Sequence, residues 1–208
     1  MYRLFGKRAF DLILAFAGLV VFFLPMVAIA VLVWTSTPGP VFFRHVRIGR
    51  FGRIFRIVKF RTMIVSPNPP PITLHHDPRI TLVGHFLRRW RLDELPQLWN
   101  VLKGEMSFVG PRPDVPGYAD RLQGEDRRLL FLPPGITGPA TLKYLDEDII
   151  LSHVDDPVRY NDEVIFPDKV RLNLEYESRC SLREDLFWLD QTILGVLKRK
   201  GKNGFLDL

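Results

Sequence analysis

The chain has 208 residues, of which 47% are hydrophobic, and it carries a formal net charge of +6 at pH 7. This length suits one domain of ordinary size, with or without an appendage, and is ample for a hydrophobic core. The single cysteine, Cys180, excludes an internal disulfide and a metal site made of several cysteines. A protein that faces the cytosol is the simplest inference.

The positive charge is concentrated in the N-terminal third of the chain. Residues 1–65 hold ten lysines and arginines but only one acidic residue, Asp11, whereas the remainder has a small acidic excess. These basic residues flank the most apolar segment. The pattern favours an anionic membrane surface or a phosphorylated substrate over a nucleic acid as the partner, and no base-stacking module is recognisable.

The most apolar segment runs from Leu12 to Trp34, 23 residues without a formal charge. As a helix it would be about 34 Å long, enough to cross a hydrocarbon core of about 30 Å. It is too long for a cleaved signal peptide. Basic residues lie on both sides of it, so a straight span would leave one basic flank outside, against the preference of Lys and Arg for the cytoplasmic side.

Pro25 stands in the middle of this segment. A proline inside a helix removes one hydrogen bond and clashes with the preceding turn, so a kink is expected at Leu24-Pro25. A helix that enters the membrane, bends there and returns to the same face would keep both basic flanks cytoplasmic. We therefore predict a re-entrant membrane helix over residues 1–36, with a single span or a buried core helix as the alternatives.

The next segment predicts a two-stranded hairpin. Val41–Phe43 and Ile54–Arg61 have strand composition, and the glycines of Gly49–Gly52 predict a turn between them. On the second strand Lys59 and Arg61 would share one face and could grip a phosphate. A solvated basic face is an equally good interpretation.

Residues 67–71 are rich in proline and predict a surface loop. From Arg79 to Arg91 the apolar side chains recur at helical spacing. His75, His76 and His85 have no carboxylate or cysteine at a spacing that would complete a metal site, so we expect surface histidines.

The acidic pair Asp93-Glu94 lies where the next helix is expected to begin. Asp93 suits an N-cap, Glu94 and Leu95 would enter the first turn, and Pro96 would fall where its missing N–H costs least. Arginines precede and follow the pair in the sequence. From these residues alone, a helix cap with surface ion pairs is the simplest interpretation.

Two stiff turns and a C-terminal helix complete the chain. Pro111 and Pro113 hold Arg112 in a rigid turn, which suits a planar donor aimed at a phosphate or carboxylate. Residues 146–177 are acidic with little periodicity and predict loops and short helices. Ser181–Glu184 is a capping box, and the helix behind it is predicted to turn these side chains inward: Leu182, Leu186, Leu189, Ile193 and Leu197.

Five segments in this order are very similar to motifs of the bacterial sugar transferases, the monotopic phosphoglycosyl transferases: Lys59–Met63, Leu92–Leu98, Asn100–Ser107, Val109–Pro113 and Pro134–Gly138. Each motif alone is weak, but the five together are specific. The resemblance covers nearly the whole chain and is to the small form of the family, which has the catalytic domain only.

The resemblance implies an activity and a location. The family transfers a sugar 1-phosphate from a nucleotide sugar, usually a UDP-sugar, to polyprenyl (undecaprenyl) phosphate and releases UMP. The reaction starts a glycoconjugate or polysaccharide at the cytoplasmic face of the bacterial inner membrane. Membrane lipids are therefore expected partners, a homodimer is left open, and the family's re-entrant helix agrees with the charge argument above.

The resemblance also implies residue roles. Asp93 would be the nucleophile that forms a covalent phosphosugar intermediate, and Glu94, with or without Asp93, would bind Mg²⁺. Lys59, Arg88 and Arg112 would contact substrate phosphates, with Arg61 a further candidate. This is consistent with the physical requirement that attack by a carboxylate on an anionic diphosphate needs its charges neutralised.

The sequence departs from the family at three places. Pro139-Ala140-Thr141 replaces an aromatic-Ala-Gln continuation, Arg44-His45 stands where a Gln is common, and the proline-rich loop is unusual. These changes affect the expected nucleotide contacts and donor-sugar identity. An aspartyl-phosphate hydrolase and a non-catalytic basic membrane scaffold are the alternative functions.

The predicted fold class is α+β and mainly helical. It comprises a Pro-kinked re-entrant membrane helix, a small β-hairpin and amphipathic helices packed at the membrane surface. Residues 37–208 would form the cytosolic catalytic domain as one continuous functional unit.

Overall fold

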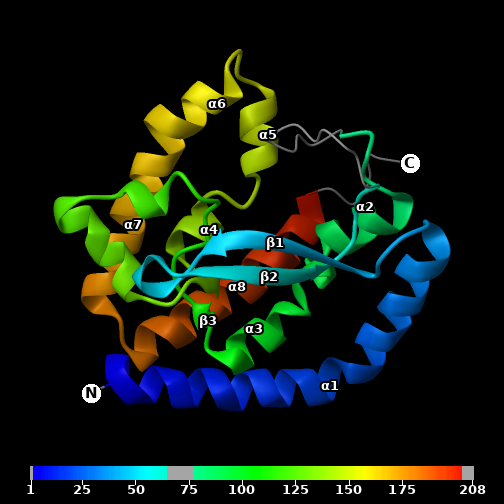
Figure 1. The fold of residues 1–208 in the computed structure, drawn as a ribbon, viewed down its shortest axis with the longest axis horizontal. Helices are drawn as coiled ribbons and strands as arrows, with labels where there is room; N and C mark the ends of the chain where they lie inside the picture. The colour runs from blue at the N-terminus through cyan, green and yellow to red at the C-terminus, as the bar shows by residue number, and fades with distance from the viewer. Residues whose placement is uncertain (1, 65–76, 203–208) are drawn as a thin grey trace.

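The computed structural model describes residues 2–64 and 77–202, and within them the chain is mainly helical with two small sheets (Figure 1). The predicted loop at 67–71 and the histidines at 75 and 76 lie outside these residues. The strands are β1 (Phe42–Ile48), β2 (Ile54–Phe60), β3 (Ser107–Val109) and β4 (Gly135–Thr137). The α-helices are α1 (Lys7–Ser36), α2 (Leu82–Arg89), α3 (Gln97–Lys103), α4 (Pro139–Lys143), α5 (Glu147–Ser152), α6 (Pro157–Tyr160), α7 (Phe166–Arg179) and α8 (Leu182–Lys202).

Helix α1 contains Pro25 and is the one helix of the described residues that is long and apolar enough to cross a membrane. Only 11% of its most apolar part is buried, which argues against the alternative of a core helix. In Figure 1, α1 runs along one edge of the molecule and changes direction before it reaches β1. Large apolar side chains exposed along it include Ile13, Phe16, Val20, Val21, Phe23 and Leu24.

The inward side of α1 contributes to two hydrophobic clusters. Ala15 packs in one of them with Phe55 and Ile57 of β2. Ile29 and Val33 pack in the other with Phe60 and Leu87. The two halves of α1 therefore share a core with the hairpin and with α2, since burying these side chains removes apolar surface from water.

The predicted hairpin is confirmed. β1 and β2 pair antiparallel in a register from Phe42↔Phe60 to Ile48↔Ile54. The turn between them contains Phe51 in a left-handed conformation, with φ of 60°, followed by Gly52 at φ of 75°. Lys59 is the second-last residue of β2, which ends at Phe60. The basic side chain of Lys59 therefore lies at the end of the hairpin that is next to the acidic pair Asp93-Glu94.

The second sheet is a short parallel pair, in which Ser107 is opposite Gly135 and Val109 is opposite Thr137. Its backbones approach closely just beyond β3. A Cβ atom on Gly135 would lie 2.2 Å from the backbone nitrogen of Gly110, so a side chain cannot be accommodated there. This contact fixes the start of the turn that carries Arg112.

The C-terminal part differs from the prediction in two respects. The acidic region contains the short helices α5 and α6 but also α7, a helix of 14 residues, because apolar and long side chains recur along one face. In α8, Leu182, Leu186 and Ile193 are 45%, 52% and 60% exposed rather than inward. The prediction was wrong for these three residues, since α8 buries the face that carries Asp185, but it is confirmed for Leu189, which packs against a core cluster with Tyr176.

The predicted cap of α8 is confirmed in part. The Ser181 hydroxyl accepts a hydrogen bond from the backbone N–H of Glu184 at 3.3 Å. The Glu184 carboxylate instead accepts from the Trp188 indole at 3.1 Å. The side chain of Leu197 lies outside those that the structure describes.

Candidate active site

The acidic pair lies in a tight 3₁₀ turn, Leu92–Glu94, between α2 and α3. The N–H of Glu94 bonds to the carbonyl of Arg91 at 3.1 Å, and that of Leu95 bonds to the carbonyl of Leu92 at 3.3 Å. Helix α3 begins only at Gln97, with Pro96 as its N-cap. The prediction that Asp93 caps this helix was therefore wrong, because the acidic pair forms its own turn before it.

Arg91 precedes this turn in a left-handed conformation, with φ of 55°. For a residue other than glycine this conformation costs about 1–3 kcal/mol. Such strain persists where surrounding contacts over-determine the backbone. The sequence placed Arg91 in a basic run beside the acidic pair but gave it no individual role, because a backbone conformation of this kind leaves no mark in composition.

Basic residues from separate segments converge on Glu94. Lys59 of β2 donates to the Glu94 carboxylate at 2.7 Å. Arg112, in the turn after β3, lies 3.8 Å from the same oxygen. The Glu94 side chain is 9% exposed whereas that of Arg112 is 39% exposed. The Arg112 guanidinium is therefore accessible to a ligand from solvent and at the same time lies near the Glu94 carboxylate.

Arg88 approaches the other member of the pair. It lies at the end of α2, where one guanidinium nitrogen is 3.6 Å from the sulfur of Met63. Its positive charge lowers the pKa of Asp93. The structure thus brings Lys59, Arg88 and Arg112 together around Asp93 and Glu94, although they come from three different elements.

Arg61 belongs to a different place. Its guanidinium donates to the carbonyls of Pro38, Thr37 and Val33 at the C-terminal end of α1. Gly39, with φ of 123°, allows this approach, because a Cβ there would lie 2.3 Å from the Arg61 guanidinium. The structure thus places the Arg61 side chain against α1 instead of on the open face expected for a phosphate grip: it is buried, and its two terminal nitrogens donate to carbonyls of the last turn of α1 and of the two residues after it.

The two carboxyls of the pair have opposite pKa shifts. Burial raises the pKa of Asp93 to about 6. The negative charge of Glu94 raises this pKa further, whereas the positive charge of Lys59 lowers it. Burial also opposes ionisation of Glu94, but Lys59, Arg91 and Arg112 outweigh it and hold the pKa of Glu94 well below its ordinary value. The surroundings therefore shift the two carboxyls in opposite directions, so Glu94 ionises more readily than Asp93.

Asn100 of α3 was not singled out from the sequence, yet it is 1% exposed and makes three hydrogen bonds. Its side-chain oxygen accepts from the N–H of Val58 at 3.1 Å, and its amide donates to the carbonyl of Arg56 at 2.8 Å and to Glu105 at 2.7 Å. Asn100 therefore fixes β2 directly beside Lys59. Its only signal in the sequence is an amide between apolar residues of a predicted helix.

The Arg112 turn is held on both sides. The carbonyl of Pro111 accepts from the N–H of Gly135 at 2.7 Å, and the carbonyl of Asp114, beyond Pro113, accepts from the N–H of Ile48 at 2.9 Å. Burial raises the pKa of the Asp114 carboxyl to about 6, with Lys169, Arg47 and Arg112 opposing this shift. Asp114 is a further titratable group beside Arg112 that sequence reasoning missed.

The donor set suits Mg²⁺ without a complete protein cage. Among residues 2–64 and 77–202, no group of three or more His, Cys, Asp or Glu side chains could hold a metal ion. Mg²⁺ commonly binds one or two carboxylates together with substrate phosphates and water. Two adjacent carboxyls next to phosphate-binding cations meet that requirement.

The family described as "Bacterial sugar transferase" matches residues 2–199. The UDP-glucose:undecaprenyl-phosphate glucose-1-phosphate transferase of Escherichia coli (strain K12) is 41% identical over 201 residues, which are 94% of this chain and 40% of that protein. The exopolysaccharide production protein ExoY of Rhizobium meliloti (strain 1021) is 34% identical over 94% of this chain and 87% of its own length.

A third relative matches a smaller part of this chain. The putative undecaprenyl-phosphate N-acetylgalactosaminyl 1-phosphate transferase of Bacillus subtilis (strain 168) is 40% identical over 60% of this chain and 77% of that protein. The UDP-galactose-lipid carrier transferase of Erwinia amylovora, 35% identical, is matched over only 41% of its length. The chain thus spans about two fifths of the longer relatives, whereas it spans most of the shorter ones.

Proposed function

Because the chain belongs to the bacterial sugar transferase family, we propose that it transfers a sugar 1-phosphate from a UDP-sugar to polyprenyl phosphate and releases UMP. The names of the relatives from Escherichia coli and Bacillus subtilis state undecaprenyl phosphate as the acceptor. The product would start a polysaccharide or glycoconjugate at the cytoplasmic face of the inner membrane.

One observation carries the proposal: a buried acidic pair is surrounded by cations from β2, α2 and the turn after β3. Such an arrangement costs folding energy, because buried ionised groups are expensive even when they are paired. The cost favours a functional reason for the buried charges. Chemistry on a diphosphate needs this combination of a nucleophile with groups that neutralise phosphate oxygens.

In the first step, an ionised oxygen of Asp93 attacks the β-phosphorus of the UDP-sugar. A bond forms between this oxygen and phosphorus, the bond from phosphorus to the bridging oxygen breaks, and UMP leaves with the electron pair. A covalent phosphosugar-aspartate remains. Because burial raises the pKa of Asp93 above its ordinary value, its ionised carboxylate is a stronger base than that of an exposed aspartate.

In the second step, a phosphate oxygen of the polyprenyl phosphate attacks the same phosphorus. The new bond forms the diphosphate, and the bond to Asp93 breaks and returns its electron pair to the carboxylate. Lys59, Arg88 and Arg112 offset the negative charge of the reacting phosphates in both steps. A Mg²⁺ ion held by Glu94, with or without Asp93, would supply further charge neutralisation.

The proposal extends to the membrane. Both ends of α1 bind the same globular part: Arg8 donates to the carbonyls of Val101 and Leu102 near its start, and Arg61 donates to the carbonyls near its end. A straight crossing would separate these ends by the bilayer. We propose that α1 bends at Pro25 and returns to the same face, with its exposed apolar side chains in lipid.

Two alternatives make different predictions. A hydrolase would release free sugar phosphate from the intermediate in the absence of a lipid acceptor. A non-catalytic scaffold would retain its biological function in Asp93→Asn and Glu94→Gln variants. The buried position of both carboxyls favours the transferase, because a scaffold that binds anionic lipids gains nothing from buried negative charge.

The test is intact mass measured on purified protein with Mg²⁺ and a panel of UDP-sugars, without acceptor. We expect a phosphosugar adduct and released UMP for the wild type and for Asp126→Asn, which alters an exposed carboxylate. Asp93→Asn should give neither. UMP release that survives Asp93→Asn when polyprenyl phosphate is present would overturn the assignment of the nucleophile.

A further inference from the structure

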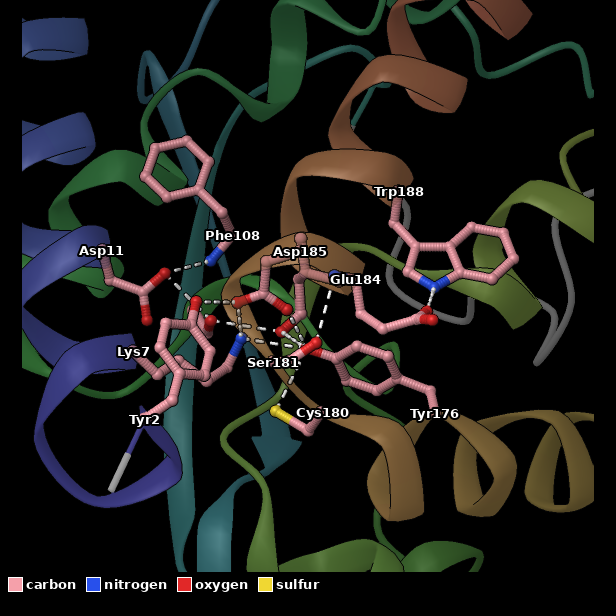
Figure 2. Close-up of polar contacts among 12 residues, drawn as sticks. Tyr2, Lys7, Asp11, Phe108, Tyr176, Cys180, Ser181, Glu184, Asp185 and Trp188 are labelled. Atoms are coloured by element: carbon pink, nitrogen blue, oxygen red, sulfur yellow. Dashed lines mark hydrogen bonds and ion pairs between the residues drawn. The ribbon is translucent and has the colours of Figure 1, made fainter.

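The start of α1 is bound directly to strand β3 by a buried carboxylate. Asp11 is 2% exposed, and one of its oxygens accepts from the hydroxyl of Ser107 and from the backbone N–H of Phe108, both at 3.0 Å (Figure 2). Asp11 is also the only acidic residue before residue 65. Burying a carboxylate is costly unless its oxygens are hydrogen-bonded, and here one oxygen accepts two hydrogen bonds from β3.

A second set of contacts joins the same region to β3. Lys7 donates to Asp185 at 2.7 Å and to the hydroxyl of Tyr176 at 3.0 Å. The Tyr176 hydroxyl also contacts Asp185 and lies 3.4 Å from the carbonyl of Val109. Figure 2 shows these side chains converging from α1, α7 and α8. All three residues of β3 are therefore held by this cluster, which comprises Lys7, Asp11, Tyr176 and Asp185.

Strand β3 leads immediately to Arg112. Gly110 donates to the carbonyl of Thr137 at 2.9 Å, and the carbonyl of Pro111 accepts from Gly135 at 2.7 Å. The intervening backbone is thus tied down and contains a proline, so it cannot absorb a shift of β3 by local rotation. A displacement of β3 would be passed on to the guanidinium of Arg112, which lies 3.8 Å from Glu94.

We propose that Asp11 is a positioning residue of the transfer reaction: by holding β3 against α1, it sets the place of Arg112 relative to the acidic pair. The inference rests on the proposed function, in which Arg112 contacts substrate phosphate. It adds that a residue of the membrane helix, remote in sequence from the reacting groups, determines where that arginine lies.

The hydrogen bonds predict which substitutions matter. Asp11→Ala removes the acceptor for Ser107 and Phe108, so kcat/KM for the UDP-sugar should fall about 10- to 100-fold, the loss expected when a substrate-positioning group is misplaced by about 1 Å. Asp11→Asn keeps an oxygen acceptor at the same position and should stay within about threefold of the wild type. Ser107→Ala, which removes one of the two donors, should have an intermediate effect.

A double-mutant cycle distinguishes positioning from general stabilisation. If Asp11 acts through Arg112, the Asp11→Ala/Arg112→Ala enzyme should be no slower than Arg112→Ala alone, because the group that Asp11 positions is already absent. Arg112→Lys serves in the same cycle if the alanine variant is too slow to measure. Thermal unfolding of each variant checks that it is folded, and Ser107→Ala replaces Asp11→Ala if the latter is not.

Arg8→Ala is the matched control, since Arg8 anchors the same turn of α1 but to the end of α3. Its effect on kcat/KM should be additive with that of Arg112→Ala. Additive effects of Asp11→Ala and Arg112→Ala, or equal coupling with Arg8→Ala, would overturn the inference. Wild-type rates for Arg112→Ala alone would instead contradict the role of Arg112 in the proposed function.

Discussion

The burial of Asp93, the nucleophile of the proposed reaction, has a cost in stability. Burial favours its neutral form in the folded protein, so the folded state holds this proton up to about pH 6, whereas an unfolded aspartate releases it near pH 3.8. The stability of the fold therefore decreases as the pH rises through this window. Above pH 6 the full destabilisation from the ionised carboxylate is present.

Asp93→Asn removes this ionisation and should stabilise the protein at pH 7.5 by about 1–2 kcal/mol while abolishing transfer, the trade-off seen when an active-site charge is removed. Most of the gain should be lost near pH 4, where the folded-state carboxyl is protonated and the unfolded-state carboxyl is only partly ionised. Thermal unfolding of both proteins between pH 4 and pH 8 measures the difference. A constant difference across this range would mean that the pKa of Asp93 is not raised.

Asn100 shows how one amide joins two elements of the site. Asn100→Ala leaves the N–H of Val58 and the carbonyl of Arg56 without their side-chain partner, and a buried group left unpaired costs about 1–3 kcal/mol. The same change frees the strand beside Lys59. We therefore expect both the free energy of unfolding and the rate of adduct formation to fall.

Asn161→Ala is the control for this prediction, because the Asn161 amide makes its contacts near the surface with Tyr118 and Asp162. It should change stability by less than about 0.5 kcal/mol, as surface substitutions usually do. Urea unfolding and intact mass give the two measurements. Equal losses in both variants would show that Asn100 has no special role in joining α3 to β2.

Arg61 binds backbone carbonyls at the C-terminal end of helix α1 and in the two residues that follow it. Arg61→Ala removes charge-assisted bonds to Thr37 and Pro38 and should destabilise the protein by about 1.5–3 kcal/mol. Arg61→Lys should recover only part of this, since an ammonium group cannot reproduce the planar fork. Because the Arg61 guanidinium binds carbonyls at the end of α1, and Asp93 and Glu94 are not among its hydrogen-bond partners, we expect KM for the UDP-sugar to stay within about twofold in both variants.

Unfolding free energy and steady-state kinetics in detergent test these expectations. A selective rise in KM for the UDP-sugar, with stability unchanged, would restore the original interpretation of Arg61 as a phosphate ligand. Lys59 offers the comparison: Lys59→Ala should raise KM, because Lys59 contacts Glu94 directly.

The elements that the sequence predicted correctly are those that depend on local pattern. The hairpin follows from alternation and from a glycine-containing turn, and α1 follows from a long apolar run. The 3₁₀ turn at Asp93 and the left-handed Arg91 depend on how α2 and α3 meet. The side of α8 that is buried was mispredicted because Asp185 pairs with Lys7, 178 residues away in sequence.

The candidate site was predictable to a similar extent. Asp93, Glu94, Lys59, Arg88 and Arg112 were named from motif resemblance, and the structure brings them together. Arg61 was misassigned because strand alternation says which face a side chain shares but not which carbonyls it will meet. Asn100 and Asp114 were missed, since their significance comes from contacts between distant segments.

For the whole molecule, the path of α1 is the main untested prediction. Cysteines introduced at Tyr2 and at Arg50, in a Cys180→Ser background, should both react with a membrane-impermeant thiol reagent only from the cytoplasmic side. This follows if both basic flanks stay on that side. A cysteine placed at Arg127, an exposed position in the globular part, is the cytoplasmic control. Periplasmic labelling at Tyr2 would establish a straight span instead.

The pairing of Lys7 with Asp185 has a consequence for the order of events during synthesis. A ribosome makes α1 first and reaches Asp185 only after 178 further residues, so at about 5–20 residues per second the start of the helix waits many seconds for its partner. During that interval Lys7 has no partner in α8, whereas Ser107 and Phe108, the partners of Asp11, are made earlier. The contact between the start of α1 and α8 can therefore form only when nearly the whole chain has been synthesised.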